Sequence, residues 1–213
     1  ENIKVEEGKM VFDMIALDVM PGMTSEKKQE DLELVLPGIH NVSNAVAAAA
    51  VTCYLGLSFE DITQGLSTFK GVKRRFDVHI NSKNLVYVDD YAHHPKEVSS
   101  TINAAKQLFP DREITVIFQP HLFSRTKDFA QDFAESLSLA NQLILLDIYP
   151  ARELPIEEVN AKMLLDLCTN PKKETCSKEE LLKILEQEEL DVLLTLGAGD
   201  IDALVEPIKH LLN

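Results

Sequence analysis

Short apolar runs alternate with charged turns over residues 1–36, a spacing that is typical of antiparallel strands. An alanine-rich segment follows at 42–55, closed by Gly56, and this pattern predicts a helix. A second short helix is predicted over 59–66. The composition then turns polar and basic and the rhythm changes, so we expect a domain boundary near residue 70.

Strands and helices alternate from residue 75 to the C-terminus. The predicted strands lie at 75–80, 85–88, 114–118, 142–147, 174–176 and 192–196, and the predicted helices at 95–108, 127–137, 157–168, 178–185 and 201–212. Repeated strand–helix units of this length predict an α/β fold with a mostly parallel, doubly wound sheet. Ligands bind beyond the carboxyl ends of the strands in such folds. This rule selects three loops as candidate sites: 89–95, 119–126 and 197–200.

Composition excludes several broad classes of protein. No apolar run approaches the roughly 18 residues that a membrane-spanning helix needs, and the first residues do not resemble a secretion signal, so we expect no membrane insertion and a cytoplasmic location. Three cysteines without a CxxC pair indicate neither a disulfide framework nor a zinc knuckle. A net charge of -14 argues against a nucleic-acid partner, because binding phosphates requires neutralising lysine and arginine.

Basic residues gather in one part of this acidic chain. Residues 71–126 carry eight basic and six acidic side chains, whereas the segments on either side are both acidic. A small anion is expected to dock at such an island. Within it, Lys73, Arg74 and Arg75 lie at the expected domain junction. Adjacent arginines are more often a solvated surface, but a position beside an interdomain cleft favours a ligand contact.

The first loop, 89–95, follows an apolar strand and precedes a helix that should begin with proline. It carries Asp89, Asp90, His93 and His94. One interpretation is that an aspartate caps the helix and the histidines are surface groups. Four such residues together at a strand end favour a site, and the N-terminus of the helix adds a preference for anions.

The second loop, 119–126, places His121, Ser124, Arg125 and Thr126 at the next strand end. An arginine there can grip a carboxylate or phosphate with two N–H groups. An equally supported interpretation is that Ser124 or Thr126 caps a helix and Arg125 pairs with an exposed acid. The third loop, GAGD, lacks the third glycine of a phosphate-binding loop and is predicted to be a tight strand-to-helix turn.

A further polar group, His40, Asn41 and Asn44, lies at the start of the alanine-rich helix, where the two asparagines share a face. Helix capping accounts for one asparagine but not for the whole group, so these residues are candidates for a ligand contact. The sequence contains no GxxxxGK[ST], HExxH or GxSxG motif. It therefore offers no triphosphate cradle of its own and no support for a metalloprotease or a serine hydrolase.

Four motifs, in this order, resemble the Mur ligase family. They are GIHNVSNA at 38–45, FKGVKRRF at 69–76, DDYAHHP at 89–95 and FQPHLFSRT at 118–126, and YPARE at 149–153 and GAGDI at 197–201 add to the resemblance. The similarity runs from about residue 31 to the C-terminus. Leu122 and Ala92 depart from it, since many relatives carry arginine and glycine, respectively, at those positions.

The resemblance implies a particular place in a larger protein. Family members have a domain for a UDP-sugar, a central ATPase domain and a C-terminal Rossmann-like domain that closes over the site. Residues 1–70 resemble the last part of the central ATP-binding domain, and residues 71–213 resemble the whole C-terminal domain. The phosphate loop and the Mg2+-binding acid and histidine would precede Glu1. We therefore expect a fragment that has no metal ligand of its own and is inactive alone.

The resemblance also implies a reaction. It is closest to the members that use ATP to join L-alanine to UDP-N-acetylmuramate, through an acyl phosphate, during bacterial peptidoglycan precursor synthesis. The residues expected at the nucleotide are His40, Asn41 and Asn44 for the adenine, Arg75 for the phosphates and Asp90 for the ribose or its neighbourhood. Those expected at the amino acid are Tyr91, His93 and Arg125, with Arg125 as the partner of its carboxylate. The expected catalytic residues are Arg75, His93 and Arg125.

Two other functions stay open on the sequence alone. A sister ligase of the family attaches a recycled tripeptide to the same UDP-sugar and resembles this chain around the DDYAHHP loop. A non-catalytic Rossmann-like binding module is the second alternative, and the missing phosphate loop supports it. Tyr91 and the YPARE stretch favour the alanine ligase over the sister enzyme. A complete set of nucleotide and amino-acid residues is not expected in a binding module that has lost its chemistry.

Overall fold

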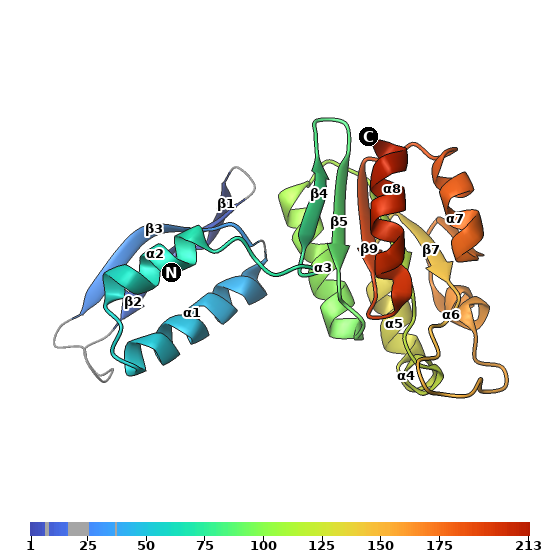
Figure 1. Ribbon diagram of the computed structural model, residues 1–213, viewed down its shortest axis with the longest axis horizontal. Coiled ribbons are helices and arrows are strands. Elements are labelled where there is room, and N and C mark those ends of the chain that lie inside the picture. Colours follow the sequence, from blue (N-terminus) through green and yellow to red (C-terminus); the bar gives the residue numbers. More distant parts are fainter. Residues whose placement is uncertain (7–8, 17–25, 37) are drawn as a thin grey trace. The chain divides into compact units, whose positions relative to one another are not determined.

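The computed structural model describes residues 1–6, 9–16, 26–36 and 38–213. The parts of the predicted strand pattern at 7–8 and 17–25 lie outside the described residues. The chain divides into two compact units, Glu1–Gly71 and Val72–Asn213. Figure 1 shows the helices and strands of both units. Of the helices in the described part of the chain, none is long and apolar enough to cross a membrane.

The described strands of the first unit form an antiparallel sheet in the order β1-β2-β3, as predicted. Its elements are β1 (Lys4–Glu6), β2 (Lys9–Ala16), β3 (Lys27–Leu34), α1 (Ile39–Tyr54) and α2 (Phe59–Thr68). Alternate residues of β2, Met10, Phe12 and Met14, join one buried cluster with Val42 of α1 and Ile62 of α2. This period of two is the pattern of a strand with one face on a core.

The strands of the second unit, all of whose residues are described, form a sheet in the order β4-β5-β9-β6-β7-β8. They are β4 (Asp77–Asn81), β5 (Val86–Asp90), β6 (Ile114–Phe118), β7 (Gln142–Leu146), β8 (Lys172–Cys176) and β9 (Val192–Leu196). Only β4, at the edge, runs antiparallel to its neighbour; the other pairs within Val72–Asn213 are parallel. The predicted mostly parallel α/β sheet is confirmed.

Helices cover both faces of this sheet. They are α3 (Pro95–Leu108), α4 (Phe123–Asp128), α5 (Ala130–Leu137), α6 (Ala161–Leu167), α7 (Lys178–Leu185), the 3-10 helix η1 (Asp200–Leu204) and α8 (Val205–Leu212). Val86 and Val88 of β5 bury in a cluster with residues of α3, α5 and α6. Tyr87, between them, buries on the opposite face with residues of α7 and α8. Such strands are apolar on both faces, which explains their continuous apolar runs.

Several predicted boundaries differ from the observed ones. β5 continues to Asp90, so both aspartates belong to the strand rather than to the loop, because Asp89 and Asp90 pair in register with Thr195 and Leu196 of β9. The helix predicted at 127–137 begins earlier and breaks at Phe129, which ends α4 and precedes α5. The last predicted helix starts as η1, and the helix predicted at 157–168 is shorter, beginning after the Asn160 cap.

Candidate functional site

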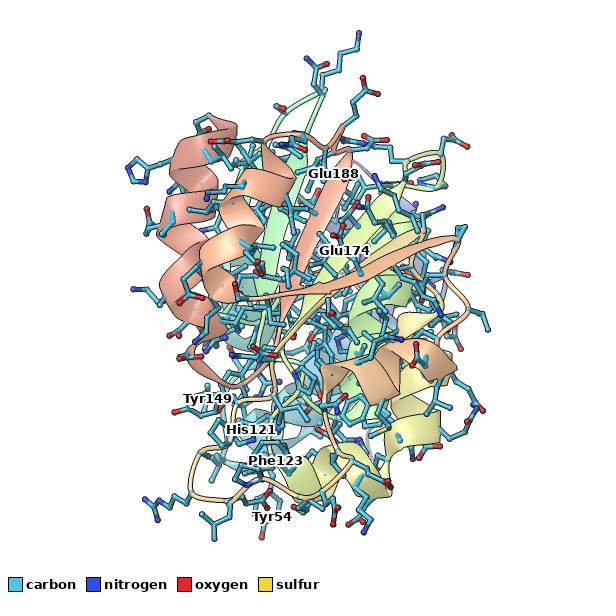
Figure 2. All side chains as sticks on the ribbon, turned by 90° about the vertical axis from the view of Figure 1, so that its right-hand side faces the viewer. Tyr54, His121, Phe123, Tyr149, Glu174 and Glu188 are labelled. Carbon is cyan, nitrogen blue, oxygen red and sulfur yellow. The ribbon has the colours of Figure 1, made fainter. Side chains whose placement is uncertain are left out.

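The candidate loops meet at the carboxyl end of the second sheet. β5, β9 and β6 are neighbours and β7 lies beside β6, so the segments that follow them lie together at the carboxyl ends of these strands, which we call the carboxyl edge. Figure 2 shows Tyr149, His121 and Phe123 together at this end of the sheet and Glu188 at the opposite end. His121 and Tyr149 form a parallel bridge there, which continues the pairing of β6 with β7. The three loops selected from the sequence therefore lie at the same end of this sheet.

Asp89 is a structural carboxylate with partners on both oxygens. Its side chain is 1% exposed; Oδ1 accepts a hydrogen bond from the Thr195 hydroxyl at 2.8 Å, and Oδ2 accepts one from Arg74 Nε at 3.1 Å. The Tyr87 hydroxyl lies 3.2 Å from Thr195 Oγ1 and extends the network on the α8 face. Burial raises the pKa of Asp89, and Thr195 and Arg74 oppose that shift.

Asp90 points to the other face and holds two stretches of backbone. Its Oδ2 accepts the Phe76 N–H at 2.6 Å, and its Oδ1 accepts the Ala92 N–H at 2.8 Å. Burial raises the pKa of Asp90 to about 6, although both N–H groups favour the ionised form. The interpretation that an aspartate of this loop caps the next helix is wrong. His94 is the cap of α3, in a capping box with Glu97.

The two adjacent arginines have different surroundings. Arg74 is partly buried: Nε donates to Asp89, Nη2 donates to the Gly197 carbonyl at 2.7 Å, and Nη1 lies 3.8 Å from the Asp202 carboxylate. Arg75 is exposed, with its guanidinium carbon 6.0 Å from the centre of the Tyr91 ring. The family resemblance singled out Arg75 alone, and no local pattern indicated the contacts of Arg74, because its partners lie far along the chain.

Tyr91 and His93 lie side by side at the start of the first loop. Their ring centroids are 5.2 Å apart in an edge-to-face arrangement, and His93 Nδ1 lies 2.9 Å from the Tyr91 carbonyl oxygen. Glu97 accepts the N–H groups of His93 and His94 at 3.0 and 3.2 Å. These bonds orient His93 before any ligand binds.

The second loop brings His121 and Arg125 to the same edge. The His121 ring stacks on Tyr149 with centroids 5.6 Å apart, and its centroid lies 6.2 Å from that of His93. Burial, the Arg125 charge and His93 together lower the pKa of His121, which favours the neutral imidazole. Arg125 Nη1 is buried and has no hydrogen-bond partner among the described residues. Such a donor is suited to an anionic ligand.

The segment after β7 is tied to the second loop by a residue that sequence reasoning did not single out. Glu153 accepts the Ser124 hydroxyl at 2.5 Å and the Ser124 N–H at 2.9 Å, and these bonds hold the pKa of Glu153 below its usual value. Ser124 therefore does not cap α4, whose cap residue is Leu122 with a left-handed φ of 73°. The only local sign of this contact in the sequence was that Glu153 is the acidic residue that ends the YPARE motif.

The GAGD loop is a tight turn, as predicted. Gly197 has a φ of 149°, and η1 follows at Asp200. Gln119 holds the turn, because its Nε2 donates to Asp200 Oδ1 at 2.9 Å and its Oε1 accepts the Ile201 N–H at 3.0 Å. A Cβ on Gly199 would lie 2.8 Å from Cβ and Cγ of Tyr149. The glycines thus serve close packing in this turn.

His40, Asn41 and Asn44 lie in the first turns of α1, within the unit Glu1–Gly71. Asn44 Nδ2 donates to Asn41 Oδ1 at 3.4 Å. The helix begins after Gly38 without a side-chain cap, so neither asparagine caps it. Among the residues that the structure describes, no group of three histidine, cysteine, aspartate or glutamate side chains is placed to hold a metal ion.

Comparison with known proteins gives consistent matches. Residues 74–199 match the family described as "Mur ligase, glutamate ligase domain". The chain is 46% identical over 212 residues to UDP-N-acetylmuramate--L-alanine ligase of Parabacteroides distasonis, covering 100% of this chain and 44% of that relative. The chain is also 48% identical over 185 residues to the ligase of the same name from Porphyromonas gingivalis, and this match covers 86% of this chain and 41% of that relative. The crystal structure of UDP-N-acetylmuramate-alanine ligase from Thermotoga maritima matches with a TM-score of 0.73 and 29% identity, covering 99% of this chain and 45% of that chain.

The chain thus spans less than half the length of these relatives. The family match begins at Arg74 and ends at Gly199, so its two ends lie in the turn and the loop that the Arg74–Gly197 hydrogen bond joins. The match covers more than half of the chain and includes the carboxyl edge that carries the candidate site. The chain belongs to the Mur ligase family.

Proposed function

We propose that this chain is part of a UDP-N-acetylmuramate–L-alanine ligase, an ATP-dependent enzyme of peptidoglycan precursor synthesis in the bacterial cytoplasm. The observation that carries this proposal is the 46% identity along the entire chain to a ligase of that name. The clustering of Tyr91, His93 and Arg125 at one sheet edge adds chemical support.

The proposed reaction has two covalent steps. The terminal phosphoryl group of ATP is transferred to a carboxylate oxygen of UDP-N-acetylmuramate, which gives an acyl phosphate and ADP. The neutral amine of L-alanine then attacks the carbonyl carbon, and the tetrahedral intermediate loses a proton and expels phosphate to leave the amide. Both steps depend mainly on alignment of the reactants and on stabilisation of charge. Mg2+ would neutralise phosphate charge in the first step, and we assign it no ligand in this chain.

For the nucleotide, we assign Arg75 to the phosphates and Asp90 to the ribose side. Arg75 is exposed and forms no ion pair with the residues that the structure describes, so its charge is available to a phosphate. Asp90 already accepts two backbone N–H groups, but a carboxylate offers about four lone-pair positions, which leaves capacity for a ribose hydroxyl. His40, Asn41 and Asn44 are assigned to the adenine because amide and imidazole groups can match its edge.

For the amino acid, we assign Arg125 to the carboxylate. Its buried Nη1 lacks a partner among the described residues, and an arginine can bind a carboxylate through two parallel hydrogen bonds. Tyr91 and His93 line the same edge and shape the pocket around the small side chain. Leu122, where many relatives carry arginine, leaves Arg125 as the main cation that we assign to this carboxylate.

Phosphate release tests the proposal directly. ATP, Mg2+ and UDP-N-acetylmuramate are supplied with L-alanine or with the recycled tripeptide, to this chain and to the complete reading frame that contains it. We expect turnover with L-alanine in the complete protein, and none in this chain, whose 213 residues contain no GxxxxGK[ST] loop. Turnover with the tripeptide alone would favour the sister ligase. Silence of the complete protein with both substrates would favour the binding module.

A further inference from the structure

We propose that Arg74 is a positioning residue that fixes the Arg75 backbone and the Tyr91 ring for their substrates. The inference rests on the proposed function, because Arg75 and Tyr91 derive their roles from it. Arg74 itself touches no substrate in this proposal. It acts through the segments that it joins.

Arg74 connects three separate parts of the carboxyl edge. Its guanidinium is bonded to Asp89 at the end of β5 and to the carbonyl of Gly197 after β9. The same group lies over the Tyr91 ring, with its central carbon 5.0 Å from the ring centroid. One planar cation therefore fixes a strand end, a turn and an aromatic side chain at once.

The backbone around Arg75 is fixed on both sides. Arg74 and Phe76 have left-handed φ values of 59° and 50°, which non-glycine residues adopt only when the surroundings hold them. The Arg74 carbonyl accepts the Tyr91 N–H at 2.7 Å, and the Phe76 N–H is held by Asp90. The side chain of Arg75 projects from the middle of this fixed turn.

The two arginines therefore divide their tasks. The guanidinium of Arg74 is partly buried and already bonded to a carboxylate and a carbonyl, so it is not available to a phosphate. The exposed guanidinium of Arg75 is available. Thr195 orients Asp89 from the opposite oxygen, so the acid that receives Arg74 is itself fixed. A displacement of about 1 Å at a reacting group can cost about 10²-fold in rate. The left-handed torsions of Arg74 and Phe76 are therefore expected to serve the positioning of Arg75.

Lysine cannot replace these contacts. Its single ammonium can pair with Asp89, but it lacks the planar fork that also reaches the Gly197 carbonyl and lies over the Tyr91 ring. Arg74→Lys therefore keeps the charge and removes the cross-link.

Arg112 provides a matched control at the amino end of the same sheet. It also pairs with an aspartate, Asp191, and donates Nη2 to the carbonyl of that residue at 2.6 Å. Its guanidinium carbon lies 5.6 Å from the centre of an aromatic ring, Phe109, and both arginine side chains are 20% exposed. Arg112→Lys makes the same chemical change where no substrate is expected.

The experiment measures kcat and KM for ATP and L-alanine in the complete ligase, per folded molecule, together with amide hydrogen exchange. We expect Arg74→Lys to lower kcat by about 10- to 100-fold through Arg75 and to raise KM for L-alanine through Tyr91. We expect Arg112→Lys to change each constant by less than about twofold, because a contact far from the chemistry affects only stability. Exchange at the Phe76 and Tyr91 amides should speed up in Arg74→Lys and not in Arg112→Lys.

Equal kinetic constants in the two lysine variants would overturn the proposal. If Arg74→Lys fails to fold, Thr195→Val, which removes the hydroxyl that orients Asp89, is measured in its place and should shift the same constants in the same direction. A complete protein without L-alanine ligation would instead reject the proposed function. Amide exchange still decides in that case whether Arg74 fixes the turn, since it requires no turnover.

Discussion

The two ends of the second sheet carry the same kind of contact in different settings. At each end an arginine pairs with an aspartate, donates to a backbone carbonyl and lies over an aromatic ring. At the amino end the aspartate, Asp191, is 38% exposed, and the Asn141 side chain accepts the N–H of Ile114, the first residue of β6. These contacts complete the strand ends.

The carboxyl end differs in burial and in backbone strain. Asp89 is 1% exposed, Asp90 is buried beside it, and Arg74, Phe76 and Leu122 adopt left-handed backbone conformations. Burying carboxylates and holding unfavourable torsions both cost free energy. The comparison teaches that an arginine–aspartate pair alone does not mark a site. The candidate site is distinguished instead by several energetically unfavourable features in one place, the buried carboxylates and the left-handed torsions, which the fold itself does not require.

The largest effect is expected for Arg75→Ala in the complete protein that contains this chain, if it has the proposed ligase activity. Removing one group that stabilises transition-state charge costs about 10²- to 10³-fold in turnover. Because Arg75 is exposed, stability should change little. The measurement is the rate of phosphate release under saturating substrates.

Lys83→Ala is the matched control for this prediction. Lys83 is an exposed cation in the β4–β5 turn, at the amino end of β5, so its removal makes the same charge change away from the proposed site. We expect parental turnover from it. If Arg75→Ala turns over within a few fold of the parent, Arg75 is not part of the site, and this test shows no functional difference between the two ends of the sheet.

Asp90 gives a pH-dependent test of burial at the carboxyl end. Burial raises its pKa from 3.8 to about 6, so the folded chain favours the protonated acid. The associated stabilisation is present in full below pH ~4 and is lost as the pH rises through about 6. At 1.36 kcal/mol per pKa unit, a shift of about two units corresponds to roughly 3 kcal/mol.

Urea unfolding of the second unit at pH 4, 5, 6 and 7, in the parent and in Asp90→Asn, isolates this contribution. The asparagine does not titrate, so its other costs are constant with pH. We expect the free energy of unfolding of the parent minus that of the variant to fall by about 2–3 kcal/mol between pH 4 and pH 7. A constant difference would show that burial does not shift the pKa of Asp90, and a difference that grows with pH would show that its pKa is lowered instead.

The positions of most strands along the chain were predictable, and so was the choice of the three loops that follow them. Nearly continuous apolar runs such as 114–118 and 192–196 are strands buried on both faces, and their observed bounds are those predicted. Helix 95–108 was equally clear, because Pro95 opens it and Leu108 ends its apolar pattern. Where one face alone is buried, as in α6 and β8, the weaker pattern gave only approximate bounds.

The contacts that build the site were not predictable from local pattern. Arg74 and Gly197 are 123 positions apart, and Thr195 and Asp89 are 106 apart, so no sequence window contains both partners. The extension of β5 to Asp90 has the same origin, because a neighbouring strand that comes late in the chain supplies the pairing. The roles assigned to His40, Asn41 and Asn44 stay predictions, as do those of Arg75, Asp90, Tyr91, His93 and Arg125.

Arg125→Ala tests the carboxylate assignment with a smaller expected effect. A hydrogen bond to a charged group contributes about 1.5–3 kcal/mol, which corresponds to a rise of about 10- to 100-fold in KM for L-alanine. KM for ATP should change much less. The exposed Arg152 lies on the neighbouring loop and is the control: Arg152→Ala should leave both constants near the parental values. A larger effect on ATP than on L-alanine would contradict the assignment.

Gly199 tests how closely the carboxyl end is packed. A Cβ at Gly199 would lie 2.8 Å from Cβ and Cγ of Tyr149 and closer still to Oε1 of Gln119. Gln119 cannot move away without losing its bonds to Asp200 and Ile201. Gly199→Ala should therefore lower the free energy of unfolding of the second unit by about 1–3 kcal/mol, as overpacking does in a core.

Gly65→Ala is the opposite case. Gly65 lies inside α2, and a Cβ there meets no atom within 4 Å, so alanine should raise the free energy of unfolding of the first unit by about 0.5–1 kcal/mol through its helix preference. Urea unfolding followed separately for the two units gives both values. A stabilising Gly199→Ala would mean that Tyr149 and Gln119 relax freely. The carboxyl end would then be no more tightly packed around Gly199 than the exposed face of α2 is around Gly65.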